Sequence, residues 1–464
     1  MTTNFVTSGT TTVSTVSSDS YIVLAPGALD IASGGGITGA TAVGPGSILW
    51  IESGGTATSS SIVGGTQYDY GNAIGTVVSN GGVQHVYFGG TASGSVIAAG
   101  SYQDVFYANV TGTTLAGYQQ VLVGGLATGT VIVSGGDEYV GAGGTTVGTV
   151  ITSNGLQYVD LGATANGTEI DHGGFQYVLG TAANTQVNNG GIQEVAGTST
   201  NGVLSSGAIQ HVLLGGSAVA TNVQAGAFQD VANGTVDSTT LSGNMQVQAG
   251  GNATNTRIVA GGFEYVGTGG TASTTTIDTG GLQYVNVGGV ANATTINGGF
   301  EFVAGTANGA AVNNGELDVA GIANDTVLSG GFEHVLGGGT EHNVDFTGPS
   351  ATLYLDNAAG LTGTVSNFAV GDSIDLLNTA VNSFNFDGAT LTLVTSGGDY
   401  SYQFAGVEAG TQLNVASDGH GGTSVSLSLL TQFSASLVPG SGSDGGLIPS
   451  NSAPSNPDPL HAQT

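Results

Sequence analysis

A short phrase recurs along most of this 464-residue chain, and it limits the possible folds more than any other feature. The phrase consists of two glycines, an apolar residue, Gln or Glu, any residue and Val, as in GGFQYV at 173–178 and GGLQYV at 280–285. Its Gln or Glu positions lie 16 to 19 residues apart, and degenerate copies around Leu29 and Leu49 bring the series to 18. A repeat of this length is one supersecondary unit that buries its apolar face by stacking on its neighbours.

A second phrase lies between copies of the first: Thr-Ala, two residues, Thr, one residue, and Ile or Val, as in TASTTTI at 271–277. Val, Ile, Thr, Tyr and Phe favour strands, and glycine takes positive φ values at corners without a Cβ clash. Each repeat therefore predicts two short strands, each followed by a glycine-rich corner. Since two strands cannot bury a face alone, we expect an all-β fold in which the repeats stack as coils of a parallel β-solenoid.

The repeat and its interruptions predict four regions. Residues 1–26 form an N-terminal cap or leader segment, and residues 27–340 form the strand-loop-strand solenoid. Residues 341–430 break the repeat and predict a C-terminal β domain that caps the solenoid, because an open end exposes unpaired backbone. Residues 431–464 are rich in Pro, Ser and Gly, which predicts a disordered tail.

Alternation along a strand assigns the columns of equivalent positions to faces. The closing Val of the first phrase suits the core, and alternation then turns the Gln/Glu column inward as well. We expect a buried ladder in which each amide bonds the amides of the neighbouring coils, formed by Gln157, Gln176, Gln193, Gln210 and Gln229. The repeat spacing also places Gln246 in this column.

Four glutamates occupy the same column, namely Glu138, Glu264, Glu301 and Glu333. An ionised carboxylate is costly to bury. The alternative is that these residues mark a bend where the alternation breaks.

The column after the Gln/Glu position mixes charged and aromatic residues, so we expect it to face solvent; it includes His85, Asp104, His211 and His334. It also predicts an exposed aromatic ladder with about 4.8 Å between coils, formed by Tyr139, Tyr158, Tyr177, Tyr265, Tyr284 and Phe302. Aromatic faces suit sugars and apolar surfaces. The alternative is that such ladders only stabilise stacking.

Charge excludes several functions. The chain has one basic residue, Arg257, against 31 acidic ones, and its net charge is −30. Binding to nucleic acids or anionic lipids needs more Lys and Arg than this. Without Cys there are no disulfides or thiolate metal sites, and no apolar run is long enough to span a membrane. Depletion of Lys and Arg, with abundant Gly, Thr, Ser and Asn, favours an extracellular or bacterial cell-surface location.

Residues of chemical interest are scattered. Catalysis by paired carboxylates needs two acids at fixed separation, whereas Asp171 and Asp318 stand in isolated positions. The column histidines lie many coils apart, and we expect Arg257 to be an exposed ion-pair partner. Asp372, Asp375 and Asp387 could ligate calcium, but loop capping explains them equally well. The sequence therefore predicts no catalytic residue, no metal site and no cofactor.

The two phrases together resemble the strand-loop-strand repeat of autotransporter passengers found in AIDA-type bacterial adhesins. The resemblance covers roughly 27–339. It implies an extracellular right-handed β-helix that is carried to the cell surface and often promotes adhesion or autoaggregation. Some members carry heptose on repeat Ser or Thr, which implies a glycosyltransferase partner and candidate acceptors at Thr91, Thr271 and Thr276. Separately, GDSIDL at 371–376 resembles a stretch in the terminal β-domains of bacterial proteins exported by the type I route.

We therefore predict a non-enzymatic extracellular or cell-surface β-solenoid passenger, for which the resemblance also implies O-glycosylation. Its long repetitive face would mediate adhesion, autoaggregation or biofilm formation, with glycans, surfaces or other copies as partners. Two alternatives stay open. One is a carbohydrate-active β-helix enzyme with acids clustered in a groove, and the other is a stalk that presents a further C-terminal module.

Overall fold

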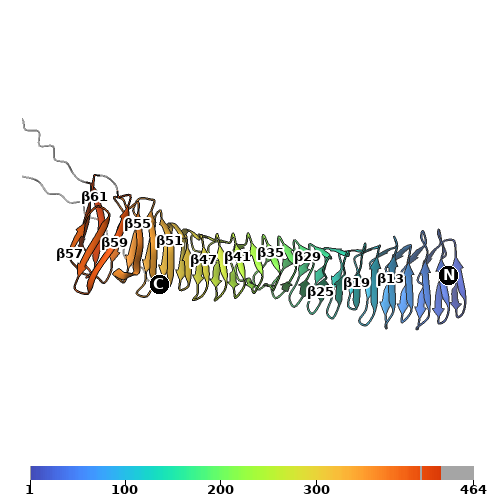
Figure 1. The fold of residues 1–464 in the computed structure, drawn as a ribbon. Coiled ribbons are helices and arrows are strands. Elements are labelled where there is room, and N and C mark those ends of the chain that lie inside the picture. Colours follow the sequence, from blue (N-terminus) through green and yellow to red (C-terminus); the bar gives the residue numbers. More distant parts are fainter. Residues whose placement is uncertain (1, 408–409, 430–464) are drawn as a thin grey trace, which may run out of the picture.

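The computed structural model describes residues 2–407 and 410–429. These residues form 61 β-strands in one continuous sheet, from β1 (Thr3–Val6) to β61 (Thr423–Leu429), and one short 3-10 turn at Ala358–Gly360. The strands wind into a long rod (Figure 1). The prediction of an all-β, parallel solenoid is confirmed. No helix that could span a membrane occurs in the described ranges.

A single coil contains three strands, where the sequence predicted two. In one coil these are β25 (Leu156–Val159), β26 (Thr164–Asn166) and β27 (Glu169–Ile170). The second phrase is divided because Gly167, between β26 and β27, has a φ of 66°, in the left-handed region where no strand continues. Each strand pairs in parallel with its equivalent in the next coil, so Gln157 lies opposite Gln176 of β28 (Phe175–Val178).

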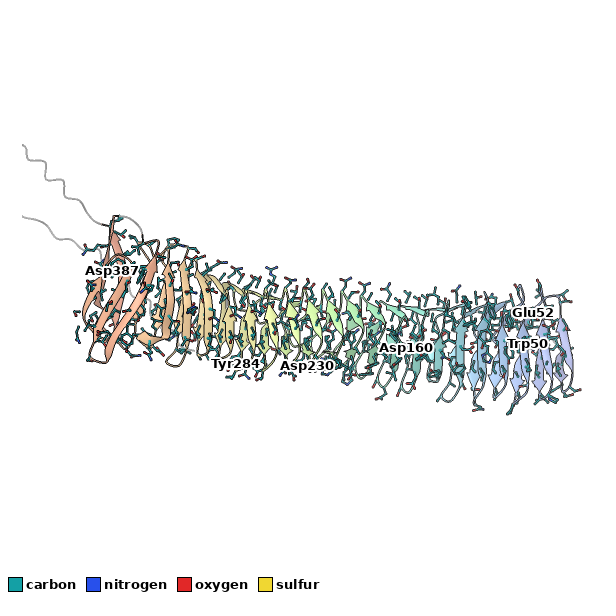
Figure 2. All side chains as sticks on the ribbon, viewed as in Figure 1. Trp50, Glu52, Asp160, Asp230, Tyr284 and Asp387 are labelled. Atoms are coloured by element: carbon teal, nitrogen blue, oxygen red, sulfur yellow. The ribbon has the colours of Figure 1, made fainter. Side chains whose placement is uncertain are left out.

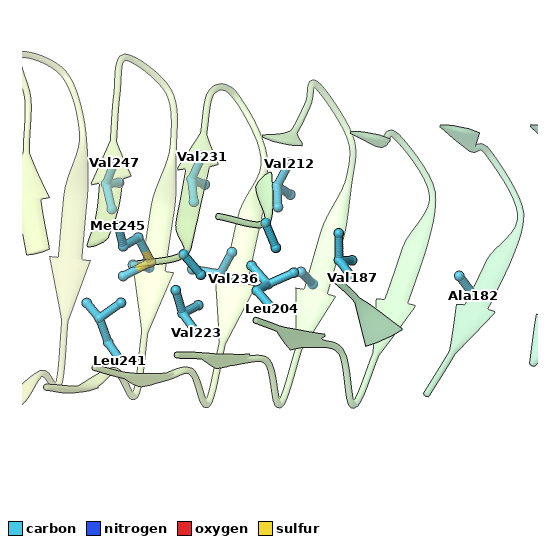
Figure 3. Packing of buried hydrophobic residues seen from close by; sticks show 14 of the residues in the cluster. Ala182, Val187, Leu204, Val212, Val223, Val231, Val236, Leu241, Met245 and Val247 are labelled. Carbon is cyan, nitrogen blue, oxygen red and sulfur yellow. The ribbon is translucent and has the colours of Figure 1, made fainter. Parts of the chain in front are cut away.

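The core runs along the axis of the rod as stacked apolar columns. In most coils the second inward residue of the first strand is a buried Val, and the inward residue of the third strand is a buried Ile, Val or Leu. Figure 3 shows Val212, Val231 and Val247 on one wall, with Val223 and Leu241 facing them. Alternating burial along the strands confirms that these columns point inward, as predicted.

One coil departs from the predicted register. The repeat spacing placed Gln246 in the inward column, and this prediction is wrong. Strand β40 (Asn244–Val247) pairs with β37 (Phe228–Val231) so that Met245 lies opposite Gln229 and Gln246 lies opposite Asp230. A shift of one residue would turn every side chain of β40 to the other face, and the packing of Val247 in the core prevents it.

Corner glycines permit the coils to approach closely. Gly173 has a φ of 74°, and a Cβ on the following Gly174 would lie 2.5 Å from the carbonyl oxygen of Ile151 in the preceding coil. A side chain at the second glycine would therefore push the coils apart. This is the physical reason for the paired glycines of the phrase.

The first strands of successive coils pair in parallel without a break from β2 (Thr10–Val13) to β56 (Ser373–Leu376). The solenoid therefore extends beyond both ends of the repeat that was recognised in the sequence. At β56 the pairing changes: β61 pairs with it in antiparallel orientation, and β57 (Val381–Phe386), β58 (Thr390–Thr395) and β59 (Gly398–Ala405) form an antiparallel set at the red end of Figure 1. The predicted domain limits stay a prediction, and the tail at 431–464 lies outside the described residues.

Candidate functional surface

Inside the rod, the five glutamines of the predicted ladder are fully buried and lie in one line. From Gln176 on, the Nε2 atom of each donates to the Oε1 atom of the preceding glutamine, at 2.6 Å from Gln176 to Gln157 and 2.7 Å from Gln193 to Gln176. Nε2 of Gln157 donates to the carboxylate of Glu138 at 2.6 Å. Gln210 and Gln229 continue the line, with distances of 2.6 Å each. Because an amide both donates and accepts, it can link the coils before and after it. These residues hold coils in register and do not reach the surface.

The glutamates of the same column also point inward, so the alternative of a bend is wrong. Glu264 and Glu301 both lie opposite Gln283 on the neighbouring strands, and both are 0% exposed. Burial raises the pKa of Glu264 to about 7 and that of Glu301 to about 8. These carboxyl groups bind protons at pH values where an exposed glutamate is ionised.

Sequence reasoning missed two further buried acids. Glu341 lies on β53 (Thr340–Phe346), opposite Ala323 of the preceding coil. It therefore belongs to a different inward column, and the Gln/Glu pattern did not predict it. Burial raises its pKa to about 7, and it raises the pKa of Glu333 further as a neighbouring carboxyl. Asp69 accepts hydrogen bonds from Gln67 and Gln84, both at 2.7 Å, while burial raises its pKa to about 7.

On the outside, the column after the Gln/Glu position forms a continuous line of side chains, which we call the outward strip. In the middle of the rod it contains Tyr139, Tyr158 and Tyr177, with ring centroids 5.6 and 5.4 Å apart and planes within 24° of parallel. The hydroxyl of Tyr139 donates to Asp160, and this hydrogen bond raises the pKa of Tyr139 to about 12. The half-buried rings thus stack on one another in a fixed orientation along the strip.

A second aromatic run on the strip comprises Tyr265, Tyr284 and Phe302, with centroids 5.6 and 5.1 Å apart and planes within 11° of parallel. Between the two runs the strip is polar, and it includes His211 and Asp230, whose Nδ1 and Oδ2 atoms are 3.5 Å apart. Figure 2 labels Tyr284, Asp230 and Trp50 at separate points along the rod. The strip therefore alternates between aromatic and polar segments.

A third aromatic group near the N-terminus escaped sequence reasoning. We call it the N-terminal platform, and it comprises Trp50, Tyr68, Tyr70, His85, Phe88 and Tyr107. Trp50 and Tyr68 are stacked on the outward strip at 4.3 Å. The available signal was a local concentration of aromatic residues at the ends of the first strands and in the corners that follow them, namely Tyr70, Tyr87, Phe88, Phe106 and Tyr107.

One strip residue does not face solvent as predicted. Asp104 is 7% exposed, because the hydroxyl of Tyr87 and the ring of His85 cover it. Tyr87 donates to its Oδ2 atom at 2.8 Å, and Nδ1 of His85 lies 2.8 Å from its Oδ1 atom.

The candidate glycan acceptors lie on the middle and third strands. Thr91 is exposed on β14 (Thr91–Ser93) and donates to Asn72 at 3.0 Å. Thr271 on β44 (Thr271–Ser273) and Thr276 on β45 (Thr276–Asp278) are partly exposed. Their side chains therefore point away from the core, whereas the neighbouring Thr275 is buried.

Arg257, Asp372 and Asp387 have structural partners, whereas the buried Oδ1 atom of Asp375 accepts no hydrogen bond. Arg257 is exposed and pairs with Asp278 at 2.7 Å, as predicted. Asp387 accepts from the backbone nitrogens of Ala389 and Thr390, which is turn capping. Asp372 accepts from two backbone nitrogens in the same way. No group of three or more metal-ligating side chains is assembled within residues 2–407 and 410–429.

No model of a known protein family matches the chain, and no curated protein matches it. Among solved structures it is similar to a TibC-catalyzed hyper-glycosylated TibA fragment, with 31% identity over 65% of this chain and 94% of the fragment, and a TM-score of 0.41. PfbA, a surface adhesin of Streptococcus pneumoniae, aligns over 83% of this chain and 91% of its own with 7% identity and a TM-score of 0.10, which supports no inference.

Proposed function

We propose that this chain, which belongs with the TibA fragment to the autotransporter-type β-solenoids of the adhesin kind, is a non-enzymatic adhesive rod. It acts outside the cell or on the bacterial surface. Its role is adhesion, autoaggregation or biofilm formation.

The observation that carries this proposal is the outward strip. Equivalent side chains recur along one line of a rod whose coils are locked by buried hydrogen bonds, and aromatic segments alternate with polar ones. Each ring offers a weak contact, and many contacts on one rigid scaffold bind together far more tightly than any of them alone. A net charge of −30 keeps the rods soluble before they attach.

Glycosylation of the rod is the second part of the proposal. The TibA fragment is hyper-glycosylated by TibC, and Thr91 is exposed here while Thr271 and Thr276 are partly exposed. We propose these threonines as acceptors for a glycosyltransferase partner. The buried Thr275 is a natural negative control.

Intact-mass measurement tests location and glycosylation together. The chain is recovered from culture medium, cell surface and cytosol of the native host. We expect it outside the cell, with a mass excess in sugar-sized steps that maps to outward threonines. Unmodified chain in the cytosol alone would contradict the proposal.

Adhesion is tested with beads coated with the purified chain and applied to cells and abiotic surfaces. A variant with Tyr158→Ala and Tyr284→Ala lacks the central ring of both aromatic runs, and we expect it to attach several-fold less. Gln186→Ala, an exposed position on β30 (Gln186–Val187), is the matched control. Equal attachment of all three chains would show that the strip does not mediate adhesion.

A further inference from the structure

Two rows of rings make up the N-terminal platform. The first follows the outward strip, with Trp50 to Tyr68 at 4.3 Å and Tyr68 to His85 at 4.9 Å. The second crosses four successive coils from Trp50 through Tyr70 and Phe88 to Tyr107. Its neighbouring rings are 6.1, 6.5 and 6.2 Å apart, and their planes differ by only 8°, 1° and 10°. The second row is a series of near-parallel rings along the rod.

The backbone places the last two rings of this row in an unfavourable conformation. Phe88 and Tyr107 have φ values of 47° and 48°, in the left-handed region that disfavours bulky side chains. Most other described residues with positive φ values are Gly or Asn, such as Gly143 and Asn233. Both rings stay outside the core, with 64% of Phe88 and 51% of Tyr107 exposed. The strain is therefore not offset by burial, as expected where a side chain is held ready for a ligand.

Perpendicular rings keep the row in place. Phe106 contacts Phe88 and Tyr107 edge to face, with planes at 88° and 83°. Beside it, the hydroxyl of Tyr87 donates to Asp104 and lies 3.0 Å from Nδ1 of His85. The platform thus combines exposed aromatic rings with oriented hydrogen-bonding groups.

We propose that the N-terminal platform binds an uncharged polysaccharide chain, an inference that rests on the proposed adhesive function and names its ligand. Aromatic faces pack against the apolar faces of sugar rings, while nearby polar side chains bond the hydroxyls. A row that extends over four coils suits a chain-shaped ligand better than a single small molecule.

Charge decides between the possible occupants. Asp30 lies opposite Trp50 on the neighbouring strand, and Glu52 is exposed two residues after Trp50. The chain has no Lys, and its single Arg is many coils away. These acids would repel an anionic polysaccharide from the platform, and they disfavour the equally acidic surface of a second copy as its occupant.

Trp50 is the only tryptophan of the chain, so its fluorescence reports directly on the platform. The purified chain is titrated with two neutral polymers, dextran and mixed-linkage β-glucan, and with anionic alginate. We expect a saturable change with at least one neutral polymer and none with alginate. The absence of a saturable change with both neutral polymers would overturn the proposal. So would a change that follows protein concentration without sugar, which would indicate a second copy as the occupant.

A double variant, Phe88→Gly with Tyr107→Asn, separates binding from folding. Gly and Asn suit left-handed backbone, so we expect an unchanged or higher melting temperature together with at least tenfold weaker binding. Leu161→Asn, which removes a 75% exposed apolar corner residue elsewhere, should bind as the wild type. Undiminished binding by the double variant would overturn the proposal.

The bead assay separates this inference from the proposed function. If wild-type and double-variant beads attach equally, adhesion stands and the platform has no part in it. If wild-type beads fail to attach, the proposed function itself is wrong.

Discussion

Two stretches of the same interior column are filled differently. In the amide coils, Gln157 to Gln229, every glutamine donates to the preceding side chain of the column, and the first four also accept from the following glutamine. In the carboxyl coils, which contain Glu264, Glu301, Glu333 and Glu341, the ladder gives way to acids. Glu264 accepts from Gln283 at 2.6 Å, whereas Glu301 has a hydrogen bond only from the hydroxyl of Thr294, at 3.3 Å. An ionised carboxylate can only accept hydrogen bonds, so it cannot donate to a neighbouring coil and the ladder ends there. A carboxyl group can donate only when it is protonated.

The same backbone accommodates amides and carboxylic acids in this column. Only the acids make the free energy of unfolding depend on pH. The acids have higher pKa values in the folded chain than in the unfolded chain, so the folded state binds more protons. Stability from such groups is complete below the unfolded pKa and is lost as pH rises through the folded value. For Glu264 and Glu301 this range extends from the ordinary 4.5 to about 7 and about 8. The amide coils have no such dependence.

The largest expected effect is the loss of the carboxyl coils at alkaline pH. Each buried acid should cost about 1.4 kcal/mol per pH unit within its range, so several kcal/mol are lost between pH 5 and pH 8.5. Hydrogen exchange measured by mass spectrometry, corrected for intrinsic rates, should show the carboxyl coils losing protection while the amide coils keep it. Equal protection at both pH values would refute the comparison.

Converting one acid to an amide should remove much of this sensitivity. For Glu301→Gln we expect a gain of about 4 kcal/mol at pH 8.5 and a change within about 1 kcal/mol at pH 5. Urea unfolding at the two pH values measures it. Glu194→Gln, on the outward strip, is the matched control and should change stability by less than about 0.5 kcal/mol. A gain of the same size at pH 5 would point to packing rather than proton binding.

The reverse change should transfer the behaviour to the amide coils. In Gln193→Glu the new carboxyl would accept from Gln210, as Glu264 accepts from Gln283. We therefore expect a similar pKa and a loss of about 3 kcal/mol on going from pH 5 to pH 8.5. The same urea experiments test it, and a variant whose stability does not change with pH would mean that the interior solvates the charge.

Repetition explains how much was predictable. The coil stack, the inward columns and the stacking of Tyr139 with its neighbours follow because each repeat fixes the register of the next. Met245 took the place of Gln246 because repeat length varies by a residue or more, and only core packing selects the face. Glu341 entered the interior from another column. Phe88 and Tyr107 lie at corners, and the alternation of faces along a strand does not predict the direction of a side chain in a corner.

The smallest expected effect concerns the ion pair on the outside of the carboxyl coils. Asp278→Asn removes the partner of Arg257, whose side chain is 65% exposed. Water solvates both charges, so we expect less than about 1 kcal/mol, decreasing further with salt. Urea unfolding at pH 7 in low and high salt measures it. A loss as large as that predicted for an inward acid would mean that surface charge, and not the inward column, distinguishes these coils from the amide coils.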